Sequence, residues 1–227
     1  MASAFVLILA TGKSYLEQHG SKAHRIDAGS PDVDTKVALK FAPQYPLAFF
    51  CDTEDDLKQT VKAVQDTGGE MLLFEADLST NDYLPESIAS VTKSFGKRCA
   101  AAIFQLRNRL IPSLPFLEQS TSHIRETAVS PIAGAYAFAQ HAVPLLFNHA
   151  DRAGYPPTLI FSGSSGTSSS DEITDNALVA LSRSLGREFG KKGIHVSHVK
   201  FKKGRETSSG TDQRAADTKS ISVSCSQ

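Results

Sequence analysis

The sequence predicts one α/β domain built on a doubly wound, mostly parallel sheet. The first observation behind this prediction is the order of patterns in residues 157–200: an apolar run, a Gly/Ser loop, an amphipathic helix and a second apolar run. Two parallel strands need such a helical crossover between them. The second observation is that further short apolar runs alternate with helical patterns between residues 5 and 104. This alternation is typical of α/β domains with a parallel sheet.

The crossover near the C-terminus locates a candidate site. Residues 158–161 are apolar and partly β-branched, which predicts a buried strand, and the loop 162–166 follows directly. Apolar residues then recur at helical spacing over 176–190, before a second strand that starts at Ile194. Ligands of open α/β sheets bind at the carboxyl ends of the strands. The loop 162–166 is therefore a candidate ligand site.

The remaining elements follow from the same patterns. Residues 5–9 form a continuous apolar run, as expected for a central parallel strand that is covered on both faces. Residues 1–203 are predicted to form the domain, and 204–227 are polar and predict a disordered tail. A complete sheet and a sheet that lacks its last strand both remain open. The other predicted elements are helices over 55–65, 88–95 and 126–148 and strands over 71–74 and 100–104.

Composition and charge exclude several classes of function. The chain has 227 residues, 24 basic and 24 acidic, which argues against a nucleic-acid partner and against binding to an anionic membrane. Its three cysteines show neither disulfide nor metal-ligand spacing, so we expect a reduced, cytoplasmic protein. The apolar run 4–10 is too short to span a bilayer and lacks the pattern of a secretory signal. We expect a small-molecule substrate.

Several stretches of this chain resemble one known family. TLIFSGSSG, ALVALSRSLGREFGKKGIHVSHV, GAYAFAQHAVPLLF and GGEMLLFEADLS are similar to segments of the short-chain dehydrogenase/reductase family, and together the similar stretches cover most of residues 37–200. The resemblance implies a Rossmann-like fold in which 37–42 end the first helix and 45–50 form the second strand. It implies an NAD(P)-dependent oxidoreductase that acts on a carbonyl or alcohol group of a small metabolite. It also implies a homo-oligomer through the helices 126–148 and 176–190.

The resemblance places the pyrophosphate of NAD(P) at a glycine-rich turn after the first strand. Such a turn lets the backbone approach the phosphates, which the next helix N-terminus stabilises. Thr11 and Gly12 begin this pattern without completing it. A second registration uses Gly29 and puts Asp32 and Asp34 at two glycine positions, where bulk and charge oppose phosphate binding. An ordinary surface loop is the alternative to a phosphate site.

Three polar residues at strand ends match the rest of the implied cofactor site. Asp77 follows the third strand, where the family hydrogen-bonds the adenine edge; a helix cap or turn is the alternative. Asp52 ends the second strand, where a carboxylate favours NAD over NADP, with a solvated turn residue as the alternative. Gln105 follows the fourth strand, where the family commonly has Asn, with an ordinary polar residue of the loop before the next helix as the alternative.

The family's catalytic residues are matched only in part. The family uses a Ser that orients the substrate oxygen, a Tyr acid/base and a Lys four residues later, which lowers the pKa of the Tyr. Ser162 or Ser164 corresponds to the Ser, although a loop that merely caps the helix is the alternative. Asp171 and Asp175 stand at the Tyr and Lys positions and cannot play these roles. Pro131 stands where many members have an Asn.

Other chemistries find little support. Asp171, Glu172 and Asp175 suggest a carboxylate pair or a metal site, but a solvated helix N-terminus rich in acidic residues is the commoner explanation. His195 and His198 lie three apart on a predicted strand, so they face opposite sides and cannot chelate one ion. We expect no metal site.

Two functions from different classes remain open. The first is the oxidoreductase described above, with Ser162 or Ser164 polarising the substrate oxygen and a proton donor still to be identified. The second is a catalytically silent protein of the same fold, a pseudoenzyme that binds a metabolite or a partner chain. A truncated gene product, in which residues 13–26 are an insertion and 204–227 are an unrelated tail, would also explain the departures from the family pattern.

Overall fold

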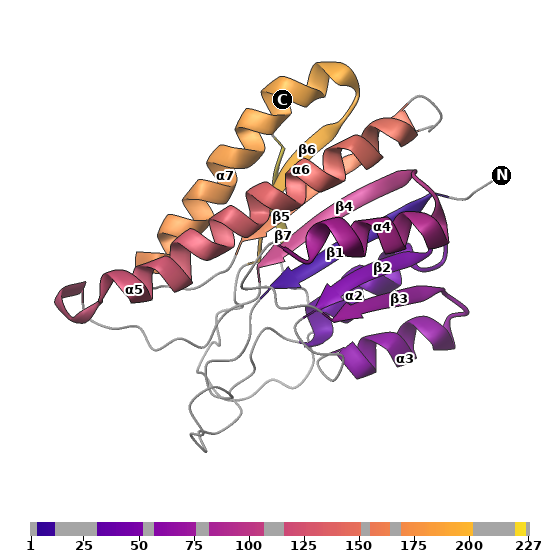
Figure 1. Ribbon diagram of the computed structural model, residues 1–227, viewed down its shortest axis with the longest axis horizontal. Helices are drawn as coiled ribbons and strands as arrows, with labels where there is room; N and C mark the ends of the chain where they lie inside the picture. Colours follow the sequence, from indigo (N-terminus) through magenta and orange to yellow (C-terminus); the bar gives the residue numbers. More distant parts are fainter. Residues whose placement is uncertain are drawn as a thin grey trace, which may run out of the picture.

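The structure of the protein is a computed structural model, and it has one central sheet with helices on both sides (Figure 1). The residues that it describes are 4–11, 31–51, 57–75, 82–106, 116–150, 155–163, 169–201 and 221–225.

Within these residues, the sheet has seven strands in the order β3-β2-β1-β4-β5-β6-β7. The first six strands are mutually parallel, and β7 is antiparallel to β6. Strand order reverses between β1 and β4, which makes this point the topological switch point of the sheet. The strands are β1 (Phe5–Thr11), β2 (Leu47–Cys51), β3 (Met71–Glu75), β4 (Cys99–Leu106), β5 (Thr158–Gly163), β6 (His195–Phe201) and β7 (Ile221–Cys225).

The helices form two layers. α4, α6 and α7 pack on one face of the sheet, where they share a core with Leu7 and Phe161, and α2 and α3 pack on the other face, with Val6 and Ile8 (Figure 1). The helices are α2 (Pro31–Phe41), α3 (Lys58–Asp66), α4 (Leu84–Phe95), α5 (Thr121–Ile124), α6 (Ser130–Ala150) and α7 (Ser169–Phe189); the short turns are η2 (Phe116–Glu118) and η4 (Gly190–Lys192), and η3 (Arg125–Val129) is a π-helical turn between α5 and α6.

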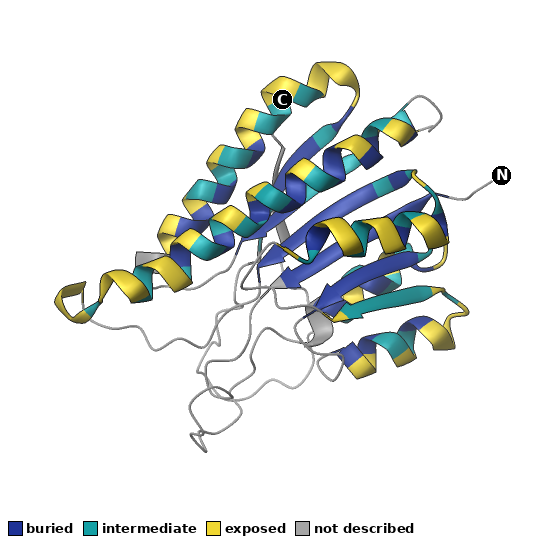
Figure 2. Ribbon diagram, viewed as in Figure 1, coloured by how far each residue is buried: buried dark blue, intermediate teal, exposed yellow. Residues whose placement is uncertain are grey.

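The central strands explain the continuous apolar runs of the sequence. Side chains alternate between the two faces of a strand, so Phe5, Leu7 and Leu9 enter the core under α4 and α6, and Val6 and Ile8 enter the core over α2 and α3. All of these side chains are buried, as are those of β2 (Figure 2). Burying each of them contributes about 1.5–3 kcal/mol to the free energy of folding. The predicted doubly wound α/β domain is confirmed.

Several elements differ from the sequence prediction in their bounds or in their regularity. The strand predicted over 158–161 continues to Gly163, because Ser162 pairs with both Gln105 of β4 and Val199 of β6. Ser162 therefore belongs to a strand and not to the loop. The helix predicted over 176–190 begins at Ser169, two turns earlier. The helix predicted over 126–148 contains the π turn η3.

The last strand, β7, lies within the segment predicted to be a disordered tail. Its residues Ile221–Cys225 pair with β6 along the whole antiparallel ladder, from Ser197 to Phe201. A parallel sheet that ended at β6 would expose a row of unpaired backbone groups, and β7 covers this edge. Of the two alternatives left open, the described residues favour a sheet that continues past β6 by one antiparallel strand. Among the described helices, none is both long and apolar enough to cross a bilayer.

Candidate functional site

The carboxyl ends of β4, β5 and β6 carry buried polar side chains next to the switch point. The register places Gln105 of β4 opposite Ser162 of β5, and Gly163 of β5 opposite Lys200 of β6. Because neighbouring strands keep paired side chains on the same face, these residues divide into two groups on opposite faces of the sheet. One group faces α2, and the other faces α7.

The group that faces α2 consists of Asp34, Gln105 and Ser162, and we call it the Ser162 cluster. Asp34 lies in the first turns of α2, and Gln105 Nε2 donates a hydrogen bond to its Oδ1 over 2.5 Å. The three side chains are 3%, 5% and 2% exposed, although each is polar or charged. Their position at the end of two parallel strands puts hydrogen-bonding groups where ligands of this fold class bind.

Two oxygen atoms of the Ser162 cluster have no hydrogen-bond partner within the part of the chain that the structure describes. They are Oε1 of Gln105 and Oγ of Ser162, and both are buried. Leaving a buried polar group unsatisfied costs about 1–3 kcal/mol. A folded chain that accepts this cost at two residues paired across β4 and β5 is suited to a ligand that offers hydrogen-bonding groups at this edge.

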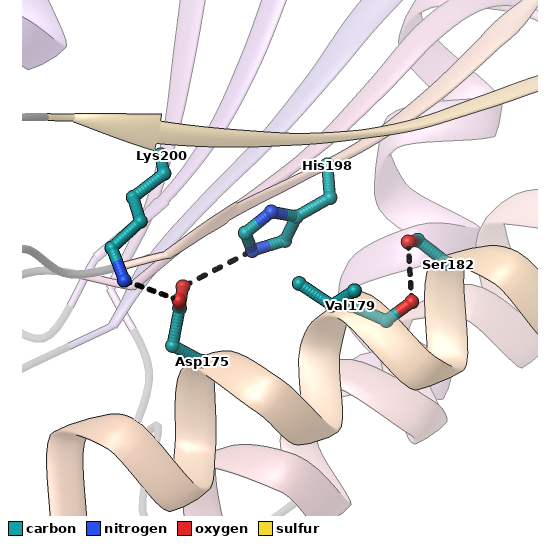
Figure 3. Close-up of polar contacts among 5 residues, drawn as sticks. All are labelled: Asp175, Val179, Ser182, His198 and Lys200. Atoms are coloured by element: carbon teal, nitrogen blue, oxygen red, sulfur yellow. Dashed lines mark hydrogen bonds and ion pairs between the residues drawn. The ribbon is translucent and has the colours of Figure 1, made fainter. Parts of the chain in front are cut away.

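The group that faces α7 consists of Asp175, His198 and Lys200, and we call it the Asp175 cluster (Figure 3). Lys200 Nζ donates a hydrogen bond to Asp175 Oδ2 over 2.7 Å, and His198 Nε2 lies 3.3 Å from Asp175 Oδ1. Asp175 and His198 are 5% and 3% exposed, whereas the side chain of Lys200 remains 44% exposed. Lys200 thus joins a buried carboxylate to the surface.

Gly163 leaves the space that the Asp175 cluster occupies. A Cβ atom at residue 163 would come within 1.7 Å of Asp175 Oδ1 and within 2.9 Å of His198 Nε2. Neither distance is compatible with a real side chain. The glycine is therefore required here because of this close approach and not because of its backbone angles.

Burial lowers the pKa of His198 below its ordinary value of 6.5. The charge of Asp175 raises this pKa and the charge of Lys200 lowers it, but burial is the largest effect and the pKa stays lowered. A buried imidazole resists protonation because its charged form loses hydration. His198 is therefore neutral at pH 7, and Lys200 provides the positive charge that balances Asp175.

The structure brings together two of the residues predicted from the sequence, Ser162 and Gln105. Thr11 ends β1, where its backbone pairs with Leu106 at the switch point. The other predicted site residues, Gly12, Gly29, Asp52, Asp77 and Ser164, lie outside the described residues. Their roles stay predictions.

Sequence reasoning missed the Asp175 cluster. The solvated helix N-terminus predicted for the acidic residues of this helix is correct for the exposed Glu172 but wrong for Asp175, which is buried and paired. The signal that was available is the alternation on β6: His198 and Lys200 are two apart, so they share a face. Among the described residues, no group of acidic, His or Cys side chains could hold a metal ion.

The Ser162 cluster fits one half of a dinucleotide better than the other. The unpartnered oxygens of Gln105 and Ser162 suit amide and hydroxyl groups such as those of nicotinamide, ribose or a substrate alcohol. Asp34 stands at a predicted glycine position in α2, and its charge opposes a pyrophosphate at this helix N-terminus. The described residues therefore suit the nicotinamide and ribose groups of such a ligand, and they do not favour binding of its phosphates.

Comparison with solved structures relates this arrangement to known proteins. A short-chain dehydrogenase/reductase from Burkholderia xenovorans superimposes with a TM-score of 0.67 and 23% identity, over 87% of this chain and 76% of that chain. One from Sinorhizobium meliloti 1021 gives a TM-score of 0.66 and 16% identity, over 90% and 82% of the two chains. The NADH-dependent reductase A1-R′, responsible for alginate metabolism, gives 0.62 and 14%, over 86% and 75%.

These likenesses show that the chain has the fold of the short-chain dehydrogenases/reductases, and they confirm the Rossmann-like sheet expected from the sequence. No family model matches the chain, and no curated protein matches it either.

Proposed function

We propose that this chain, which has the short-chain dehydrogenase/reductase fold, is an NAD(P)-dependent oxidoreductase acting on a carbonyl or alcohol group of a small metabolite. The observation that carries the proposal is the buried, unpartnered hydroxyl of Ser162 at the carboxyl end of β5. It lies at the sheet edge where this fold class binds ligands, one strand from β4 and the switch point. The neighbouring unpartnered oxygen of Gln105 supports the same edge as the ligand site.

The chemistry assigned to Ser162 is orientation of the substrate oxygen. Its Oγ–H group donates a hydrogen bond to the carbonyl oxygen and so stabilises the negative charge that develops there. Because Ser162 sits on a strand, its hydroxyl needs little reorganisation for this task. A bound dinucleotide supplies or accepts the hydride. Ser164, two residues further on, is the second candidate for the same role.

The cofactor contacts extend the proposal to residues predicted from the sequence. Thr11 and Gly12, or Gly29 in the second registration, are proposed to approach the pyrophosphate, with Asp77 at the adenine. Asp52 favours NAD over NADP. The carboxylate of Asp34 weakens phosphate binding, so we expect a lower affinity for the cofactor than a glycine at this position would allow.

A second function is favoured by the Asp175 cluster. Asp175 stands at the position where the resembling family has its Lys, and its carboxylate is already paired with Lys200. A carboxylate held in this way neither lowers the pKa of a catalytic Tyr nor donates to a ribose hydroxyl. The second candidate is therefore a catalytically silent protein that binds a metabolite or a partner chain through the same edge.

We also propose that two copies of the chain associate through α6 and α7. These helices pack against each other on one face of the sheet, and near them the large apolar side chains of Val129, Tyr136 and Ile173 are about half exposed. Exposed apolar side chains on adjacent helices are typical of an association surface. Light scattering of the purified protein tests this proposal, and a monomer at micromolar concentration would contradict it.

The test of the oxidoreductase is a titration with NADH and NADPH, followed by fluorescence and by thermal shift. We expect saturable binding with a rise in melting temperature, because a ligand that binds only the folded state stabilises it. Ser162→Ala should weaken the binding of a carbonyl substrate, whereas Ser184→Ala, at an exposed position of α7, should not. A folded protein that binds neither cofactor at millimolar concentration excludes the oxidoreductase and favours the silent protein.

A further inference from the structure

Three elements of the fold meet at the carboxylate of Asp175. Asp175 comes from α7, and its two oxygens face Lys200 and His198, both from β6 (Figure 3). The backbone of Gly163, at the end of β5, lies so close to Oδ1 that no Cβ fits between them. One side chain thus contacts the carboxyl ends of two neighbouring strands.

The position of this carboxylate is strongly determined. A charged carboxylate that is 5% exposed must be paired, because its hydration is lost on burial, and Lys200 provides the pairing charge. The preceding residue of α7, Thr174, donates a hydrogen bond from Oγ1 to the main-chain oxygen of Thr127 in the π turn η3, over 3.3 Å. Consecutive residues of α7 are therefore tied to the sheet and to η3.

The contact between Asp175 and Gly163 affects the position of Ser162, the residue before Gly163. Side chains alternate along β5, so Ser162 points toward α2 while the Cα of Gly163 faces α7. The carboxylate occupies the space into which the end of β5 would otherwise move. On the opposite face, Ser162 pairs with Gln105 of β4, so a shift of the end of β5 would displace its hydroxyl relative to Gln105.

We propose that Asp175 is a positioning residue of the ligand site, which holds the carboxyl end of β5, and with it Ser162, through a carboxylate shared by Lys200 and His198. The inference rests on the proposed function in one respect, since it takes Ser162 as the group that contacts the ligand. Asp175 stands where the resembling family has its catalytic Lys, and it cannot play the role of that Lys. The proposal gives it a positioning role instead. Asp175 itself does not touch the ligand.

The first experiment tests, in the absence of any ligand, whether the carboxylate of Asp175 interacts with both His198 and Lys200. The side-chain proton signals of His198 are titrated by NMR in the wild type, in Asp175→Asn and in Lys200→Met. Asp175 raises the pKa of His198 and Lys200 lowers it, so Asp175→Asn should lower the pKa further and Lys200→Met should raise it. The exposed variants Glu172→Gln and Lys191→Met are the controls. Equal pKa values in all five proteins would overturn the proposal.

The second experiment measures how firmly the end of β5 is held in the sheet. Amide hydrogen exchange of residues 158–163 is compared between the wild type, Asp175→Asn and Glu172→Gln, with β2 as the internal reference. Loss of the buried charge should speed exchange at the end of β5 on the order of tenfold or more and leave β2 unchanged. Unchanged exchange at β5 would overturn the positioning role.

The two proposals can fail separately. If the wild type binds no NADH or NADPH, the oxidoreductase is excluded while the exchange and NMR measurements still decide the role of Asp175. If NADH binds, its dissociation constant should rise in Asp175→Asn and stay constant in Glu172→Gln. Equal NADH affinity in all three proteins, with unchanged exchange, would show that Asp175 does not position the site.

Discussion

The Ser162 cluster and the Asp175 cluster lie at the same edge of one sheet, on opposite faces. Their buried polar groups have different partners. In the Asp175 cluster, Lys200 pairs with the carboxylate, and Oδ1 of Asp175 lies 3.3 Å from Nε2 of His198 without a hydrogen bond between them. In the Ser162 cluster, Asp34 is bonded to Gln105, but one oxygen of Gln105 and the hydroxyl of Ser162 have no partner. The two clusters differ in that Lys200 neutralises the buried carboxylate of Asp175, whereas the unpartnered oxygens of the Ser162 cluster belong to uncharged side chains.

The substitution with the largest expected effect is Gly163→Ala, on the face of the Asp175 cluster. The new Cβ would lie 1.7 Å from Asp175 Oδ1, so the carboxylate or the end of β5 would have to move. We expect a loss of about 3 kcal/mol or more in the free energy of unfolding, measured by urea denaturation. Gly190→Ala, where a Cβ meets nothing within 4 Å, is the control and should change little.

A second substitution shows whether the collision is the cause. In the double variant Gly163→Ala/Asp175→Ala the obstructing carboxylate is gone, so the cost of the alanine at 163 should be much smaller than in the wild-type background. If the two substitutions are simply additive, Gly163 is required for some other reason and the contact with Asp175 is not the constraint.

The next effect is a dependence of stability on pH. The folded-state pKa of His198 is below 6.5, so between that pKa and 6.5 the unfolded chain binds more protons than the folded chain. Stability should be fully present above pH 6.5 and fall as the pH drops below it. His198→Gln should flatten this dependence. It should not remove it, because burial and Arg98 also lower the pKa of His149.

Urea denaturation at a series of pH values between 5 and 8 measures this dependence. The control is Ser184→Ala, at an exposed position of α7, which removes no titratable group and should leave the slope unchanged. A slope in His198→Gln equal to that of the wild type would mean that His198 protonates as easily in the folded chain as in the unfolded one.

A smaller effect with the opposite sign is expected for Ser162→Ala. Removing a buried hydroxyl without a partner should leave stability unchanged or raise it by about 1 kcal/mol. Ser182→Ala, which removes a buried hydroxyl bonded to the main-chain oxygen of Val179 over 2.8 Å, should instead destabilise the fold. Thermal denaturation of both variants makes the comparison, and equal losses would mean that Ser162 is satisfied in the folded state.

The smallest effect concerns Cys99, at the start of β4. Burial raises the pKa of its thiol to about 12, so almost no reactive thiolate exists at pH 8. Iodoacetamide should leave Cys99 unmodified in the folded protein and modify it in urea, as read by peptide mass spectrometry. Rapid modification in the folded protein would show that this end of the sheet opens readily.

Local sequence patterns predicted most of the secondary structure for a physical reason. A strand buried on both faces must be apolar throughout, as in β1 and β2, and a helix that covers a sheet must repeat its apolar residues at helical spacing, as in α3. The resemblance to a family added the order of these elements. The boundary at Ser162 was missed because a Gly/Ser-rich stretch predicts a loop, whereas pairing with Gln105 and Val199 extends the strand.

The sequence by itself determined that this chain forms an α/β domain, that Ser162 and Gln105 directly follow the apolar runs of two strands, and that the Tyr and Lys positions of the resembling family hold aspartates. Only the tertiary structure decided the partners of these residues. Gln105 meets Asp34 across 71 positions of the chain, and Asp175 meets Lys200 across 25. Such pairs depend on the order and register of the strands and on the packing of helices, so no local pattern encodes whether a buried carboxylate is paired or a buried hydroxyl is left for a ligand.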